Sequence, residues 1–156
     1  MEKPNKVVGG VALGCAVYMG PNRLELAKLL LESGALSTSL THGGSCPLTA
    51  ACSNEDADIN VVNLLLEHNK NINFRIKAKT MKWKMIHMTA KTSAKVFKTS
   101  NGILRSIATD SGATALHYAA LRGDTEIVEL LLGRGADPRL KNDLGQDAAA
   151  MCKSFP

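Results

Sequence analysis

Apolar residues along the chain recur at the spacing of an amphipathic helix, most clearly between Gly112 and Asp137. Ile127, Leu130 and Leu131 fall at i, i+3 and i+4, so they share one face of a helix. Stretches that contain Gly, Asp or Pro separate such apolar segments, as turns between helices do. The pattern therefore predicts pairs of short helices joined by turns.

The clearest segment also carries the signals that start and end helices. Thr114 can cap a first helix, because its hydroxyl can accept a hydrogen bond from a free backbone N–H. Gly123 can adopt the left-handed conformation that ends this helix. Ala119 and Ala120 are small enough to let a second helix approach closely. Gly135 is then expected to close that second helix.

Glycines that precede the helical segments set a regular spacing. Gly9 and Gly44 are 35 residues apart, and Gly112 and Gly145 are 33 residues apart. The interval of 68 residues between Gly44 and Gly112 equals two intervals of 34. We therefore expect a degenerate repeat between them, visible around residues 82–90.

The segment from residue 112 to residue 142 resembles the ankyrin repeat. The matching positions are Gly112, Thr114, Leu116, His117, Ala119, Ala120, Gly123, Ile127, Val128, Leu130, Leu131, Leu132, Gly135, Ala136 and Asp137. Only the Pro of the family's Thr-Pro-Leu-His pattern is replaced, by Ala115. Earlier leucine triplets at residues 29–31 and 64–66 fit the same pattern less completely.

The resemblance implies an all-α fold, an ankyrin-repeat solenoid of antiparallel helix pairs with hairpin-like turns. We expect a single domain over residues 1–156. Its repeats are expected at about 6–40, 41–78, 79–108 and 109–141, with a partial fifth at 142–156. The third repeat is expected to be degenerate, because its second helix, near residues 94–100, lacks a leucine triplet.

The same resemblance implies a non-catalytic protein–protein interaction module, a scaffold or an adaptor. Such proteins bind a partner on a concave surface made of hairpin tips and first helices. The positions that match this surface and are expected to contact a partner are His42, Lys79, Lys82, Trp83, Lys84, Ser111, Tyr118, Leu121, Arg122, Asn142 and Asp143. Exposed first-helix positions in earlier repeats include Tyr18, Met19, Ser53 and Asn54. No enzyme activity, cofactor, metal or small-molecule substrate is expected.

Charge is distributed unevenly along the chain. Residues 69–109 contain ten basic residues and no Asp or Glu, whereas the rest of the chain has nine basic and 14 acidic residues. One interpretation is a patch around Lys79, Lys82, Trp83 and Lys84 that recognises an acidic protein, a nucleic acid or an anionic lipid. The alternative is a solvated insertion in a decayed repeat, with Trp83 packed along a turn.

Histidines and cysteines suggest other chemistry only out of context. The resemblance assigns His87 and His117 to hydrogen bonds within the stack, and no Ser, Cys or carboxylate lies at a spacing typical of a triad with either. The four cysteines show no paired spacing, so we expect reduced thiols in the cytoplasm or nucleus. A zinc site from Cys46, Cys52, His42 and His68 is the less favoured alternative, because it has no Cys-x-x-Cys pair.

Two further alternatives concern the ends and context of the chain. The apolar segment 7–19 follows two lysines and imitates a signal peptide, but the ankyrin pattern continues through it. The chain also fits the ankyrin segment of a larger signalling or ubiquitin-pathway enzyme, in which case the catalytic residues would lie elsewhere.

Overall fold

The computed structural model describes residues 6–19, 21–41, 43–69, 71–78, 80–96 and 109–154. These residues form helices and turns and contain no strand. The helices are α1 (Lys6–Met19), α2 (Arg23–Glu32), α3 (Pro47–Ser53), α4 (Ile59–His68), α5 (Met81–Val96), α7 (Ala115–Arg122), α8 (Thr125–Gly133) and α9 (Ala148–Ser154). The expected all-α fold of paired helices is confirmed.

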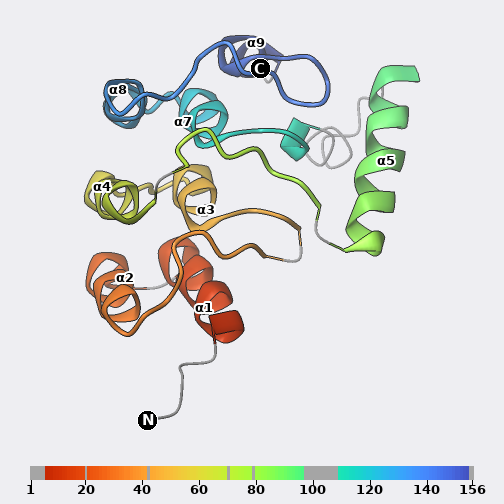
Figure 1. The fold of residues 1–156 in the computed structure, drawn as a ribbon. Helices are drawn as coiled ribbons and strands as arrows, with labels where there is room; N and C mark the ends of the chain where they lie inside the picture. The colour runs from red at the N-terminus through yellow and green to blue at the C-terminus, as the bar shows by residue number, and fades with distance from the viewer. Residues whose placement is uncertain are drawn as a thin grey trace.

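Most helices form two parallel columns (Figure 1). The first column stacks α1, α3, α7 and α9, and the second stacks α2, α4 and α8. The core lies between the columns, where Leu13, Leu48, Leu65 and Leu131 are fully buried. Each helix pair therefore buries its apolar face only because its neighbours cover it, as expected of a solenoid.

Helix α7 begins and ends where the sequence signals predict. Thr114 has an extended backbone before α7, and its backbone N–H donates to His117 Nδ1 over 3.2 Å. Gly123 ends α7 with a φ of 72°, in the left-handed region. Asp124 then caps α8 by accepting from the Ile127 N–H over 3.1 Å. Local chemistry thus fixes both ends of the turn that joins α7 to α8.

His117 links one unit of the stack to the next. Its Nδ1 accepts hydrogen bonds from the Thr114 backbone N–H and lies 2.9 Å from the Thr114 hydroxyl, while its Nε2 lies 3.1 Å from the Gln146 carbonyl oxygen. This arrangement requires a neutral ring with the proton on Nε2. Burial lowers the pKa of His117, which favours that neutral form.

A pair of backbone hydrogen bonds recurs in the hairpins that follow each helix pair. In the first hairpin the Thr41 N–H donates to the Ser45 carbonyl over 2.9 Å, and the Gly44 N–H donates to the Thr41 carbonyl over 3.0 Å. In the last hairpin Asn142 and Gly145 make the equivalent bonds, over 2.8 and 3.0 Å. In both hairpins the glycine lies three positions after the residue that makes both bonds, Thr41 or Asn142.

The middle hairpin makes the same pair of bonds from distant residues. The Ile76 N–H donates to the Ala113 carbonyl and the Gly112 N–H donates to the Ile76 carbonyl, both over 2.9 Å. Ile76 therefore takes the place of Thr41 and Asn142. Ile76 and Gly112 are 36 positions apart instead of three, so the chain inserts 36 − 3 = 33 additional residues at the tip of this hairpin.

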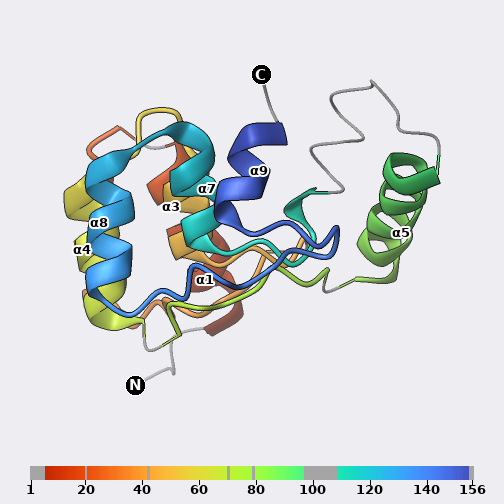
Figure 2. The same cartoon turned by 90° about the horizontal axis from the view of Figure 1, so that it is seen from above.

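The expected third repeat, residues 79–108, is therefore not a unit of the stack. Helix α3 packs directly on α7, and α4 packs on α8. Most of the described part of the insertion is the 16-residue helix α5, which lies beyond the hairpins from the stacked helices (Figure 2). The prediction was wrong because the insertion is about one repeat long and so preserves the spacing of the glycines. The expected second helix near residues 94–100 lies largely outside the described residues.

At the C-terminal end, α9 covers α7 with a buried Ala148 and Met151. This single helix is the described part of the partial fifth repeat. Among the described residues, no helix combines the length and the apolar character needed to cross a membrane.

Truncating a core leucine is expected to destabilise the stack. Leu131 of α8 is fully buried in the core, so Leu131→Ala should lower the free energy of unfolding by about 2–5 kcal/mol through lost burial and a cavity. The neighbouring Leu132 is 43% exposed, and Leu132→Ala should cost less than about 1 kcal/mol. Urea denaturation of both variants measures the difference; equal losses would contradict the assigned helix faces.

Removing the insertion is expected to leave the stack folded. Deleting residues 77–109 joins Ile76 to Asp110 and restores the three-residue interval to Gly112 that the other hairpins have. The shortened chain should unfold in a single cooperative transition monitored by circular dichroism. A chain that loses its cooperative transition would show that the insertion is required for stacking.

Candidate functional site

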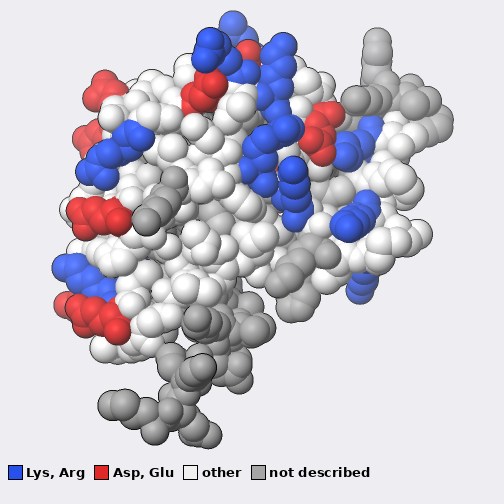
Figure 3. All heavy atoms as spheres, in the orientation of Figure 1, with Lys and Arg blue, Asp and Glu red and all other residues white. Residues whose placement is uncertain are grey.

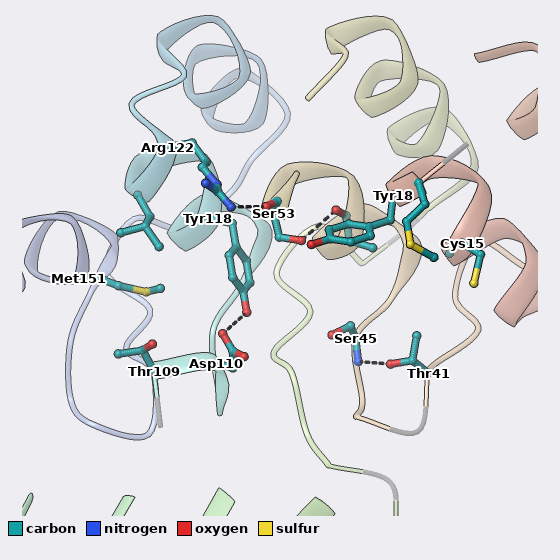
Figure 4. Close-up of a pocket in the computed structure, with 14 residues that line it drawn as sticks. Cys15, Tyr18, Thr41, Ser45, Ser53, Thr109, Asp110, Tyr118, Arg122 and Met151 are labelled. Atoms are coloured by element: carbon teal, nitrogen blue, oxygen red, sulfur yellow. Dashed lines mark hydrogen bonds between the residues drawn. The ribbon is translucent and has the colours of Figure 1, made fainter. Parts of the chain in front are cut away.

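A groove runs along the first column of helices (Figure 4). Its volume is about 430 Å³, and its residues come from α1, α3, α7, α9 and the bases of the hairpins. The lining residues are Gly14, Cys15, Tyr18, Met19, Thr41, Ser45, Ala50, Ser53, Thr109, Asp110, Tyr118, Leu121, Arg122 and Met151. The groove therefore combines apolar side chains of helices with polar groups of hairpins.

The repeat itself places these residues in a row. Cys15, Ala50, Tyr118 and Met151 each lie six positions after the glycine of their repeat (Gly9, Gly44, Gly112 and Gly145), and all four line the groove. Tyr18, Ser53 and Leu121 each lie nine positions after that glycine, and they also line it. Because equivalent residues of a solenoid face the same way, one residue per unit builds each row. The groove is thus a property of the stack.

Tyr118 and Asp110 form the polar centre of the groove. The Tyr118 hydroxyl donates to Asp110 Oδ1 over 2.7 Å (Figure 4). Burial raises the pKa of Asp110, and the hydrogen bond from Tyr118 opposes part of that rise. Burial and the neighbouring Asp110 charge raise the pKa of Tyr118, so its hydroxyl stays a donor. The bond holds the Tyr118 ring against the hairpin.

Arg122 and Asn54 connect neighbouring units beside the groove. The Arg122 guanidinium donates to the Ser53 carbonyl over 2.8 Å and pairs with Glu55 over 3.3 Å. The Asn54 amide donates to the Tyr18 carbonyl. The Glu55 side chain is largely exposed, so this ion pair contributes little to stability. The Arg122 side chain is 37% exposed and thus presents a positive charge at the edge of the groove.

The predicted contact residues fall into three groups. Tyr118, Leu121 and Arg122 lie in the groove, together with the first-helix positions Tyr18, Met19 and Ser53. Lys82, Trp83 and Lys84 lie on α5, away from the groove lining. Ser111, Asn142 and Asp143 lie in the hairpins, and His42 and Lys79 lie outside the described residues.

The hairpin residues serve mainly to hold turns together. Asn142 is buried, and its side chain donates to the Thr109 carbonyl over 3.3 Å and to Gln146 Oε1 over 3.1 Å. Ser111 is also buried and donates to Asp143 Oδ2 over 2.6 Å. These two side chains are therefore occupied within the hairpins and offer little surface to a partner.

Asp143 connects the last hairpin, the middle hairpin and α5. Its Oδ1 pairs with Arg75 Nη2 over 3.1 Å, and its Oδ2 pairs with Lys91 Nζ over 2.9 Å. Burial alone would raise the pKa of Asp143, but the hydrogen bonds from Ser111 and Lys91 and the nearby charges outweigh it and lower the pKa. Asp143 therefore stays ionised and helps to hold α5 against the hairpins.

Sequence reasoning missed several lining residues that the repeat could have revealed. Cys15 and Met151 occupy the position of Tyr118 in other units, so extending the prediction from unit to unit would have found them. Thr41 and Ser45 line the groove from the first hairpin. Their polar side chains gave no signal that distinguishes them from ordinary turn residues.

The described residues offer little support for a metal site. They contain no group of three or more His, Cys, Asp or Glu side chains close enough to hold an ion. Cys46 and Cys52 are buried, and burial raises the pKa of the Cys52 thiol, which favours the neutral form that does not ligate metals. His42, the third member of the zinc alternative, lies outside the described residues.

Removing the Tyr118 hydroxyl is expected to destabilise the fold in a pH-dependent way. Tyr118→Phe leaves the part-buried Asp110 carboxylate without its donor, at a cost of about 1–3 kcal/mol near neutral pH. Burial raises the pKa of Asp110 in the folded protein above its unfolded value of about 3.9, so the contribution of Asp110 to the free energy of unfolding falls as pH rises from that value through the folded pKa. The Tyr118 hydrogen bond stabilises the ionised carboxylate and offsets part of this loss, and the variant removes that offset. The cost should therefore be larger at about pH 7 than at about pH 4.

Urea denaturation at both pH values measures this difference. Tyr18→Phe is the matched control, because Tyr18 is exposed on α1 in the same groove. The control should cost little at either pH. Equal costs of Tyr118→Phe at the two pH values would contradict the importance of the Tyr118–Asp110 bond.

Comparison with known proteins agrees with this architecture. Residues 13–142 match the family model of ankyrin repeats in three copies. The chain is similar to the mitochondrial disaggregase of Bos taurus, with 33% identity over 132 residues that make up 80% of this chain and 18% of that protein. It is also similar to the mitochondrial disaggregase of Rattus norvegicus, with 49% identity over 45 residues, 29% of this chain and 7% of that protein. The chain thus spans less than a fifth of the length of either relative.

The match to ankyrin repeats over most of the chain, together with the stacked helix pairs, establishes that the chain belongs to the ankyrin repeat family.

Proposed function

We propose that this chain is a non-catalytic module that binds a segment of another protein in the groove along α1, α3, α7 and α9. The observation that carries the proposal is the pair of residue rows that the repeat builds along one face. Ankyrin repeats suggest protein interaction as a general role, and the family is typically non-catalytic. The groove supports this role, because it offers a partner segment a recess along one face of the stack.

The composition of the groove favours a partner segment with apolar anchors. Met19 and Leu121 provide apolar surface from the helices, and Tyr18 adds an exposed aromatic ring. Such side chains contribute most of the binding energy in many protein interfaces. Asp110, on the hairpin side, provides a polar group that can fix the orientation of a bound segment.

Charge substitutions in the groove are expected to abolish partner binding while the fold survives. Met19 and Leu121 are not part of the buried core, so Met19→Glu and Leu121→Glu should place a carboxylate on the apolar wall without a large loss of stability. Leu29 is 60% exposed on α2, outside the groove, and Leu29→Glu is the matched control.

Affinity purification from cell extract with the three variants tests this expectation. Proteins retained by the unchanged chain and by Leu29→Glu, but lost with both groove variants, are the expected groove partners. Photo-crosslinking from position 19 then identifies the contact directly. Retention of the same proteins by all four chains would argue against the groove as the binding surface.

A second proposal is that this sequence acts as the binding segment of a longer protein. It is supported by the lengths of the two disaggregases, of which the chain covers 18% and 7%. Any catalytic activity would then belong to other segments of that protein. An antibody against residues 112–142 should detect a polypeptide several times longer than this chain; a single species of the size of this chain would contradict the proposal.

The proposed cellular location depends on whether the chain acts alone or as a segment of a longer protein. The unpaired, reduced cysteines favour the cytoplasm or nucleus, which we propose for the isolated chain. The relatives' name instead favours the mitochondrion for a longer protein that contains this segment. Fractionation with the same antibody distinguishes the two locations.

A further inference from the structure

A row of exposed methionines lies on the outer face of α5. Met81 is 72% exposed, Met85 is 58% exposed and Met88 is 60% exposed. Their positions at i, i+4 and i+7 place them on one side of the helix. None of the three belongs to the hydrophobic core. A continuous apolar row on an exposed helix indicates an interaction surface, whereas isolated exposed residues do not.

Lysines flank this methionine row on both sides. At 100° per residue, Lys84 lies to one side of the row and Lys82 to the other, and both are exposed. The sequence contains no Asp or Glu between residues 69 and 109, so α5 carries no acidic residue that would offset these charges. In Figure 3 basic side chains gather over the hairpin turns and α5 with few acidic side chains among them, whereas acidic and basic side chains both lie along the edge formed by the second column of helices.

The opposite face of α5 is held by the rest of the molecule. His87 and Ala90 are buried, and the Trp83 ring lies edge-on to the His87 ring with centroids 6.0 Å apart. The Trp83 ring also approaches Gly43 of the first hairpin, and Lys91 pairs with Asp143 of the last. The helix therefore spans the hairpins lengthwise and holds the methionine row outward.

We propose that the outer face of α5 is a docking surface for a membrane that contains anionic lipids. The helix would lie in the plane of the interface, with the three methionines at the boundary between head groups and acyl chains. Lys82 and Lys84 would extend their amines to lipid phosphates on either side. A basic helix with an apolar row between its lysines has the pattern of interfacial helices.

The observations favour a membrane over the other occupants of such a face. A second copy of the chain would bring two lysine-flanked faces together, and like charges would oppose that contact. A protein groove that encloses the helix would need access to the face that His87 and Ala90 bury. A flat anionic surface needs only the exposed side and matches the charge on both flanks.

Binding of the full chain to lipid vesicles tests the proposal. Cosedimentation is measured with vesicles of phosphatidylcholine alone and of phosphatidylcholine mixed with phosphatidylserine. We expect binding only to the mixed vesicles, weakening as salt is raised to about 0.15 M. Because one lysine near an anionic surface contributes about fivefold to the binding constant, Lys82→Gln with Lys84→Gln should weaken binding about 25-fold.

A second variant tests the apolar row. Met85→Ser with Met88→Ser should weaken binding to the mixed vesicles at least about fivefold, because it removes apolar surface from the interface. Leu29→Ser with Leu132→Ser is the matched control, since these residues are exposed to a similar degree on α2 and α8. The control and the groove variant Leu121→Glu should both bind as the unchanged chain does, so failure of groove binding and failure of this inference are distinguishable.

Three outcomes would overturn the inference. The first is absence of binding to the mixed vesicles even at low salt. The second is a loss of binding with the lysine variant but not with the methionine variant, which indicates attraction by charge without docking of the row. The third is binding to polyglutamate, and not to vesicles, that both α5 variants weaken; this result would assign the face to an acidic protein.

Discussion

Each hairpin that leads from one unit of the stack to the next depends on one pair of backbone hydrogen bonds. The pair fixes the position of a glycine with positive φ, 90° at Gly44 and 80° at Gly112. These glycines also allow hairpins to approach each other closely. A Cβ at Gly44 would lie 1.9 Å from the Lys77 carbonyl oxygen, and one at Gly112 would lie 2.6 Å from Asp143 Oδ1. Because the hairpins can pack in this way, the helices that follow them also stack, and equivalent side chains of successive units form the rows of the groove.

The middle hairpin shows how much this constraint tolerates. It keeps both hydrogen bonds and the positive φ of Gly112 although 33 additional residues separate its bonded partners. A loop insertion costs little because the entropy of closing a loop grows only slowly with its length. The tip also lies outside the two columns of stacked helices. The insertion therefore leaves the direct contact of α3 with α7 intact.

The sequence predicted the stacked units well because their signals are local. Thr114, Gly123 and the leucine triplet each act within a few residues, and the structure confirms the helix ends that they imply. The insertion was assigned as a repeat because its length equals one period, so the spacing of Gly44 and Gly112 could not distinguish the two cases. The backbone hydrogen bonds of Ile76 with Gly112 and Ala113 show that the segment is an insertion. Pairing between residues 36 positions apart leaves no periodic signal in the sequence.

The candidate site was predictable to the extent that it follows the repeat. Tyr118, Leu121 and Tyr18 were identified as exposed first-helix positions, and they line the groove. Asn142 and Ser111 were expected to be accessible because they lie in hairpin tips, but tip residues also provide the hydrogen bonds between hairpins. A polar residue in a tip is therefore ambiguous from sequence alone, since it can face a partner or its own neighbour.

The stack and the insertion each provide one candidate binding surface: the stack provides the groove, and the insertion provides the outer face of α5. The groove is built from residues that the period fixes, so its shape depends on the stacking of the helices. The outer face of α5 lies outside that period, and its composition is free of the requirements of helix packing in the stack. The two faces of α5 show this difference: Ala90 and His87 are buried toward the hairpins, whereas Met85 and Lys84 are exposed. A helix in the core would cover such methionines, so their exposure is a property that the insertion adds to the solenoid.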